Sequence, residues 1–175
     1  MTDRPHVPFK RLSNTQREAS LRSVLSAAPR DQDIHIFAYG SMMWDPLFEP
    51  VERCSATLAD YRRSFCVWSL VSRGTPERPG LALGLEACPG TECRGIAFRL
   101  KFESAEFELE ATWRRELYTA IYQPKWLDVT TDTGVVAAIA FAVDPGHPQH
   151  AAGLGLLETT AIISAAAGEN GSCRE

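Results

Sequence analysis

The segment from Lys101 to Trp126 (KFESAEFELEATWRRELYTAIYQPKW) constrains the fold most, because it places an acidic residue where an amphipathic helix has apolar ones. Ser104 is the predicted N-cap, Pro124 is expected to stop the helix, and the residues between them are good helix formers. At about 100° per residue, one stripe of the helix carries Leu109, Trp113, Leu117 and Ala120. Glu116 falls in the middle of this stripe.

Glu116 has two interpretations. The helix pattern alone favours a buried ion pair with an arginine. The alternative is a carboxyl group that works in proton transfer, since burial without a partner favours the neutral form and raises its pKa. The acids near the start of the helix need no such explanation, because carboxylates there complement the helix dipole. They are Glu106, Glu108 and Glu110.

Length and charge exclude several classes of protein. At 175 residues and 19.3 kDa, the chain is expected to form one domain with a full hydrophobic core. A net charge of −4 and a pI near 5.6 argue against nucleic-acid and anionic-membrane partners. No apolar run approaches the roughly 20 residues that span a bilayer, and the N-terminal residues lack the apolar stretch of a secretory signal. We therefore expect a cytoplasmic protein.

The cysteines are arranged neither as zinc ligands nor as a disulfide framework. They number five, none is paired as Cys-x-x-Cys, and Cys88 and Cys93 lack a companion pair at zinc spacing. The others are Cys54, Cys66 and Cys173. We expect reduced thiols and no structural metal.

Hydrophobic runs predict an α+β protein with a strongly bent sheet or small barrel. Residues 1–30 are expected to form an N-terminal arm and a helix that begins at a capping box near Ser13, and residues 31–175 to form the main domain. Cys88-Pro89-Gly90 is predicted to turn a hairpin, and the segment 75–80 to form a mobile flap. The last predicted helix covers residues 154–167. The predicted strands are Ile34–Ala38, Ser55–Leu58, Ser64–Leu70, Leu81–Glu86, Arg94–Leu100, Lys125–Thr130 and Val135–Val143.

The first predicted strand runs into Tyr39-Gly40-Ser41, followed by Met42-Met43-Trp44. A strand that ends in Gly-Ser exposes consecutive backbone N–H groups, and glycine allows the close approach that an anion-binding nest needs. A strand corner packed by aromatic residues is the alternative. The segment is neither a dinucleotide fingerprint nor a P-loop, so no nucleotide cofactor is implied.

These segments together resemble the ChaC-like γ-glutamylcyclotransferases. Residues 37–44 resemble the family's Tyr-Gly-Ser-hydrophobic-hydrophobic-Trp signature, and Arg115-Glu116 resembles its Arg-Glu pair. The other matching segments are Tyr61–Phe65, Arg73-Gly74 with Pro79-Gly80, Arg94–Phe98, and Asp144-Pro145 with His147-Pro148. The six motifs follow the family order over roughly residues 34–172.

The resemblance implies the small γ-glutamylcyclotransferase barrel with flanking helices. It also implies cleavage of glutathione to 5-oxoproline and cysteinylglycine, without metal or nucleotide. It assigns catalysis to Glu116, so proton transfer, rather than a buried ion pair, becomes the favoured interpretation of this residue. It assigns substrate binding to Ala38, Tyr39, Gly40, Ser41, Met42 and Met43.

This reaction suits a single carboxylate with a raised pKa. Such a group can take a proton from the γ-glutamyl α-amine and return it to the leaving amine. Ring closure is intramolecular, so holding the substrate folded supplies much of the rate. The amides of residues 39–41 are candidates to bind the γ-glutamyl carboxylate or the developing oxyanion.

Two departures from the family pattern bear on the site. Relatives carry a Tyr in the loop after Asp-Pro, which we place at or near His150, so His150 either replaces that Tyr or alters the site. The chain also ends at Glu175, short of a Glu-Tyr-Leu continuation expected after residues 171–173, so we expect the last helix to be less well covered.

Three alternatives stay open. The enzyme could act on other γ-glutamyl amines, because nothing reads out the Cys-Gly half of glutathione. The arginines that could meet its carboxylate are Arg62, Arg63 and Arg73. His150 invites the second alternative, an inactive glutathione-binding module. The third is a cysteine hydrolase that pairs Cys66 with His35 or His150, although no helix N-terminus or neighbouring base activates this thiol.

Overall fold

The computed structural model describes residue 7 and residues 10–29 and 32–174. A closed barrel has the strand order β1-β3-β2-β4-β5, and β1 closes it in parallel against β5. These strands are β1 (Ile34–Ala38), β2 (Glu52–Ser69), β3 (Gly80–Leu100), β4 (Tyr122–Thr131) and β5 (Gly134–Val143). The predicted α+β barrel with flanking helices is confirmed.

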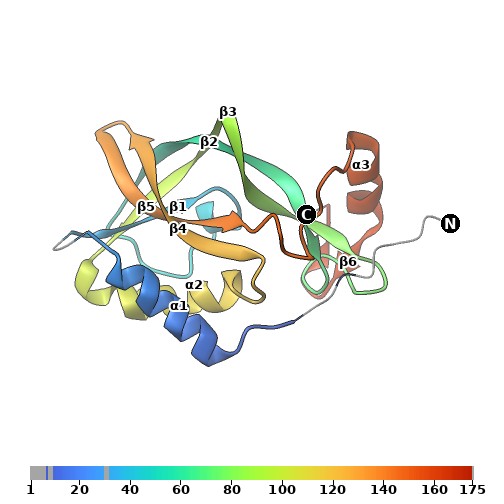
Figure 1. Cartoon of the computed structure of the whole chain (residues 1–175), viewed down its shortest axis with the longest axis horizontal. Helices are drawn as coiled ribbons and strands as arrows, with labels where there is room; N and C mark the ends of the chain where they lie inside the picture. Colours follow the sequence, from blue (N-terminus) through green and yellow to red (C-terminus); the bar gives the residue numbers. More distant parts are fainter. Residues whose placement is uncertain (1–6, 8–9, 30–31, 175) are drawn as a thin grey trace.

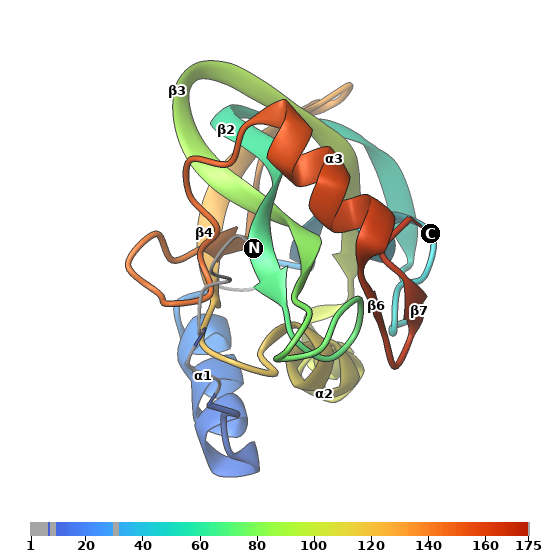
Figure 2. The same ribbon diagram turned by 90° about the vertical axis from the view of Figure 1, so that its right-hand side faces the viewer.

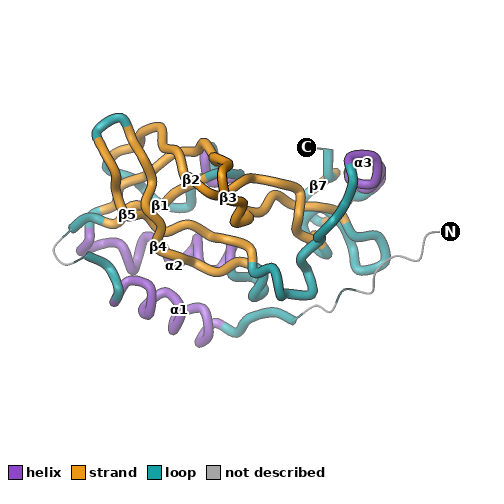
Figure 3. The backbone as a smooth tube through the Cα atoms, turned by 45° about the horizontal axis from the view of Figure 1, so that its top comes forward, coloured by secondary structure: helices purple, strands orange, loops and turns teal. Residues whose placement is uncertain are grey.

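The helices lie in two places around the barrel. Two of them lie next to each other along one side, as Figures 1 and 3 show: α1 (Asn14–Ser26) and α2 (Ala105–Glu116). The last helix, α3 (Leu156–Ala165), packs against β3 near the C-terminus (Figure 2) and leaves Leu156 and Leu157 exposed. Short elements complete the fold: the 3-10 helices η1 (Ser41–Met43) and η2 (Phe102–Ser104), and the hairpin of β6 (Ala167–Gly168) and β7 (Gly171–Ser172). None of the described helices has the length and apolar character needed to cross a bilayer.

β2 and β3 form one long bent hairpin where the sequence predicted four strands. Cys88-Pro89-Gly90 does not turn the chain between two strands, so that prediction was wrong. Instead, residues 88–91 bulge out of β3 opposite Asp60 of β2. Gly90 adopts a φ of 78° and donates its N–H to the Asp60 carboxylate at 2.8 Å. A bulge bends a strand and increases its twist, which allows one hairpin to wrap around the barrel.

The turn of that hairpin is formed by residues 70–79, which contain most of the predicted flap. Thr75 and Arg78 exchange backbone hydrogen bonds at 3.0 and 3.1 Å. The backbones of Gly74 and Gly80 pack so closely that a Cβ on Gly74 would lie 2.1 Å from the Gly80 nitrogen. Both glycines are needed for this close approach, while the mobility of the segment stays a prediction.

α2 ends at Glu116, earlier than the apolar stripe predicted. Leu117 caps it, and the chain enters β4 at Tyr122 after a turn. Ala120 is exposed, so its place in the buried stripe was wrong. Pro124 lies inside β4, opposite Phe141 of β5. A proline is tolerated there because β4 pairs with β2 only at Thr130 and Thr131, so no β2 hydrogen bond is lost at Pro124.

The largest core cluster joins α2 to the barrel. Trp113 is 1% exposed and meets the Phe141 ring of β5 edge-on, with ring centroids 5.0 Å apart. Fully buried neighbours in the same cluster include Ile34, Ile36, Phe98, Leu100, Leu109 and Ile139. The helix that carries Glu116 is therefore fixed to the barrel one turn before that residue.

α1 covers the outer side of this cluster. It begins with the capping box predicted at Ser13, in which Ser13 and Gln16 bond each other's backbone. The Trp113 indole donates to the Ser20 hydroxyl at 3.3 Å, and the Trp126 indole donates to the Val24 carbonyl at 3.0 Å. The division at residue 30 stays a prediction, and most of the expected N-terminal arm lies outside the described residues.

Candidate active site

Glu116 is the last residue of α2, and its side chain is only 17% exposed. Burial raises the pKa of this carboxyl above its usual value of 4.5, because desolvation disfavours the charged form. The Arg115 guanidinium opposes this shift through its charge and a hydrogen bond from its Nε to Glu116 Oε1 of 3.1 Å. Glu116 therefore has both an arginine partner and a raised pKa, and its role in proton transfer stays a prediction.

Arg115 links this carboxylate to the glycine-serine turn. Its Nη1 donates to the backbone carbonyl of Asp45 at 2.9 Å and to the Asp45 carboxylate at 3.1 Å. Asp45 in turn donates its N–H to the Ser41 carbonyl at 2.9 Å. The Arg115 side chain thus connects the end of α2 to the loop that follows β1, so the two predicted parts of the site adjoin.

Arg115 has one further donor. Its Nη2 is buried and has no hydrogen-bond partner within the described part of the chain. A buried donor without a partner costs about 1–3 kcal/mol. An anionic ligand next to Glu116 would satisfy this nitrogen.

The six residues of the predicted substrate loop divide into two groups. Ala38, Tyr39 and Met42 are buried, whereas Gly40, Ser41 and Met43 reach the surface. The first residues of a helix have N–H groups without intrahelical partners, and in η1 this applies to Ser41 and Met42. A Cβ on Gly40 would meet no atom within 4 Å, so open space adjoins the turn. Ligand contacts here would come mainly from backbone groups.

Two tyrosines lie near Glu116: Tyr39, which is buried, and Tyr122, which is partly buried. The Tyr39 hydroxyl donates to the Phe141 carbonyl at 2.7 Å, and the Tyr122 hydroxyl donates to the Leu83 carbonyl at 2.6 Å. Burial raises the pKa of both phenols, and the charge of Glu116 raises it further, so both stay neutral. Tyr122 was missed from the sequence because the predicted helix ran on to Pro124 and included it, whereas the structure places it at the start of β4.

The arginines proposed to meet the substrate's far carboxylate all bond to protein groups. Arg63 donates to the Tyr39 carbonyl and so braces the turn. Arg62 pairs with Glu86, and Arg73 donates to the carbonyls of Asn170 and Ser172. Their role toward substrate stays a prediction.

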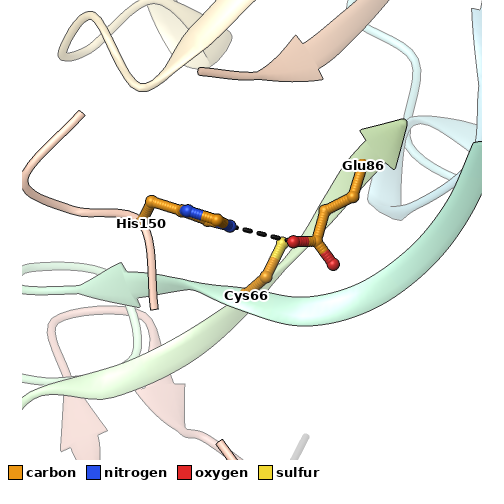
Figure 4. Close-up of side chains that lie close together, drawn as sticks. All are labelled: Cys66, Glu86 and His150. Carbon is orange, nitrogen blue, oxygen red and sulfur yellow. Dashed lines mark hydrogen bonds and ion pairs between the residues drawn. The ribbon is translucent and has the colours of Figure 1, made fainter. Parts of the chain in front are cut away.

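The fold brings Cys66 close to His150 and Glu86 (Figure 4), whereas His35 lies on β1 opposite Arg99 of β3. The His150 Nε2 lies 2.9 Å from a Glu86 carboxylate oxygen, and burial raises the pKa of the Cys66 thiol to about 11. A nucleophilic cysteine needs a lowered pKa and a base directed at sulfur. This arrangement provides neither, which argues against the cysteine-hydrolase alternative.

Comparison with known proteins gives consistent matches. A family model described as ChaC-like protein matches residues 34–175. A glutathione-specific γ-glutamylcyclotransferase of Escherichia coli K12 is 38% identical over 161 residues, covering 91% of this chain and 69% of the relative. The γ-glutamylcyclotransferase 2-1 of Arabidopsis thaliana is 32% identical over 151 residues, covering 80% and 68%. The crystal structure of a yeast γ-glutamylcyclotransferase specific to glutathione matches in fold, with a TM-score of 0.74, 18% identity and 82% of each chain covered.

Proposed function

The chain belongs to the ChaC-like family, and we propose that it cleaves glutathione to 5-oxoproline and cysteinylglycine with Glu116 as general acid and base. One observation carries the catalytic assignment. The carboxyl group of Glu116, whose side chain is 17% exposed at the end of α2, has a raised pKa and is joined by Arg115 to Asp45 in the loop that follows β1.

In the proposed reaction, Glu116 acts twice. Its carboxylate takes a proton from the α-amine of the γ-glutamyl group, and the amine nitrogen attacks the γ-carbonyl carbon to form a five-membered ring. The bond from this carbon to the cysteinyl nitrogen then breaks, and that nitrogen receives the proton from Glu116. Protons balance, and no redox partner is needed.

Binding groups would hold the substrate in the folded conformation that cyclises. The free Nη2 of Arg115 suits the α-carboxylate of the γ-glutamyl group. This leaves the backbone N–H groups of Ser41 and Met42 for the oxygen of the attacked carbonyl, where negative charge develops. Tyr39 and Tyr122 would exclude water from the carboxyl of Glu116.

Replacement of Arg115 by Met is expected to shift the acid limb of the kcat/KM profile to higher pH. Arg115 stabilises the Glu116 carboxylate, so its removal raises the Glu116 pKa further, and more alkaline solution is needed to form the base. The KM for glutathione should also rise. Arg114→Met is the matched control, because Arg114 pairs with Glu110 on the exposed side of α2. An acid limb that stays in place or moves to lower pH in Arg115→Met would contradict this role.

The proposed function is tested by measuring 5-oxoproline release from glutathione with a metal chelator present. We expect turnover of glutathione and much slower turnover of γ-glutamylalanine. Equal rates on both would indicate a cyclotransferase for γ-glutamyl amines in general.

A glutathione-binding module without activity is the second candidate, favoured by the contact of His150 with Glu86 at the position where the family resemblance implies a Tyr. Binding of glutathione without product at any pH from about 6 to 9 would support it.

Five free thiols in the structure are compatible with the reducing cytoplasm, which we retain as the proposed location.

A further inference from the structure

The fold gathers three different metal-binding side chains outside the candidate catalytic residues. The donor atoms of Cys66 on β2, Glu86 on β3 and His150 in the loop after β5 all lie within 4.8 Å of one another. Figure 4 shows the His150 ring and the Glu86 carboxylate directed at each other, with the Cys66 side chain beside them. Because the residues come from three separate segments, the cysteine spacing could not reveal this cluster.

The backbone holds the segment of His150 firmly against β2. Val67 and His150 form an isolated antiparallel bridge. On either side of it, Trp68 donates its N–H to the Gln149 carbonyl at 2.9 Å, and Ala151 donates to the Cys66 carbonyl at 2.7 Å. The separation of Cys66 and His150 is therefore set by a sheet-like ladder rather than by a free loop.

His150 and Glu86 each have further hydrogen-bond partners outside the cluster, and these leave one donor atom of each side chain directed at the cluster. The His150 Nδ1 lies 3.2 Å from the Pro145 carbonyl, which can accept an N–H from it, and this leaves Nε2 as the ring nitrogen that faces the cluster. Glu86 Oε2 accepts from Ser64 and Arg62, which leaves Oε1 facing His150. Metal-bound histidines and carboxylates in proteins are oriented by partners of this kind.

We propose that Cys66 Sγ, Glu86 Oε1 and His150 Nε2 bind a thiophilic divalent cation of the zinc class. The sulfur, nitrogen and oxygen donors match Zn²⁺ and argue against Mg²⁺ or Ca²⁺, which prefer oxygen ligands. Ligand atoms around a tetrahedral zinc ion lie roughly 3.3–3.6 Å apart, given Zn–ligand lengths of about 2.0–2.3 Å. The present donor separations, all within 4.8 Å, are close to this range, and the His150–Glu86 contact of 2.9 Å has to open when the cation enters. On binding, the cation takes the place of the His150–Glu86 hydrogen bond, and the Cys66 thiol releases its proton to solvent.

The site adjoins the candidate active site and includes neither Glu116 nor any residue of the predicted substrate loop, residues 38–43. Tyr39 and Tyr122 are within electrostatic reach of both Cys66 and Glu116. Three protein ligands also leave one coordination position open. The cation is not required for the proposed cyclisation, so binding is measured independently of turnover.

The test uses Co²⁺ as a spectroscopic substitute for Zn²⁺, titrated into the full chain with its thiols reduced. We expect one ion per chain, tetrahedral d–d absorption and a thiolate-to-cobalt charge-transfer band, all abolished by competing Zn²⁺. Cys66→Ser should lose the charge-transfer band, and His150→Gln should bind at least about 100-fold more weakly. His150→Gln carries the test if Cys66→Ser fails to fold.

Two variants serve as matched controls. Cys93→Ser removes another buried thiol, and His147→Gln removes another imidazole from the same loop. Both should bind the cation like the unmodified chain. Absence of cobalt binding in the unmodified chain, or equal binding by the Cys66 and His150 variants, would overturn the proposal.

Discussion

Replacement of Glu116 by Gln is expected to lower the release of 5-oxoproline from glutathione by about 10²–10⁴-fold, the range attributed to a positioned general acid–base group. Glutamine has nearly the same shape and can still accept a hydrogen bond from Arg115, so the local packing should survive. It cannot take a proton from the substrate amine or return one to the leaving nitrogen. The steady-state kcat should fall at every pH.

Glu110→Gln is the matched control for this substitution. Glu110 lies on the same helix, but its side chain is 46% exposed and pairs with Arg114. Removing its charge changes the net charge of the chain equally while leaving the proposed proton path intact. A comparable loss of activity in Glu110→Gln would show that helix charge, rather than the buried carboxyl, matters.

Replacement of Trp113 by Ala is expected to lower the free energy of unfolding by about 3–5 kcal/mol, the usual range for a buried tryptophan. The ring is fully buried against Phe141, and its indole N–H bonds to Ser20 of α1, so the substitution opens a cavity between two helices and the barrel. Chemical denaturation followed by far-UV circular dichroism measures the change.

The control for Trp113→Ala is Phe107→Ala in the same helix. Phe107 is 82% exposed, so its removal should change the unfolding free energy by less than about 0.5 kcal/mol. If Trp113→Ala were equally neutral, the core cluster would not be what fixes α2 and the Glu116 carboxyl to the barrel.

A bent sheet or small barrel could be predicted because apolar runs of strand length recur along the chain, but the shape of the β2–β3 hairpin could not. Cys88-Pro89-Gly90 carries turn residues, and the same residues serve a hairpin turn or a bulge. Only the pairing of both halves of β3 with β2 decides between them, and that pairing depends on contacts far apart in sequence.

The candidate site was predictable in part for a similar reason. Helical spacing predicted that the Glu116 side chain faces the core, and in the structure this side chain is only 17% exposed. The spacing could not show that α2 ends at this residue, that Arg115 reaches Asp45, or that Tyr122 lies nearby. These features follow from the way the end of α2 meets the loop after β1, which a local pattern does not encode.

The cluster around His150 shows the same limit. The sequence marked His150 only as a departure from the family tyrosine, and its partners Glu86 and Cys66 lie on strands that the fold brings together. A side chain that replaces a family residue can acquire new partners when long strands pass beside it. Such partners become visible only once the register of β2 and β3 is known.

The most direct measurement of the role of Glu116 combines glutathione binding and product formation in one variant. Glu116→Gln is titrated with glutathione by calorimetry, then mixed with saturating glutathione under single-turnover conditions, and 5-oxoproline is quantified. We predict binding within a few-fold of the unmodified chain and almost no 5-oxoproline on the time scale of its turnover. Product formed at the unmodified rate by the bound variant would contradict proton transfer by Glu116.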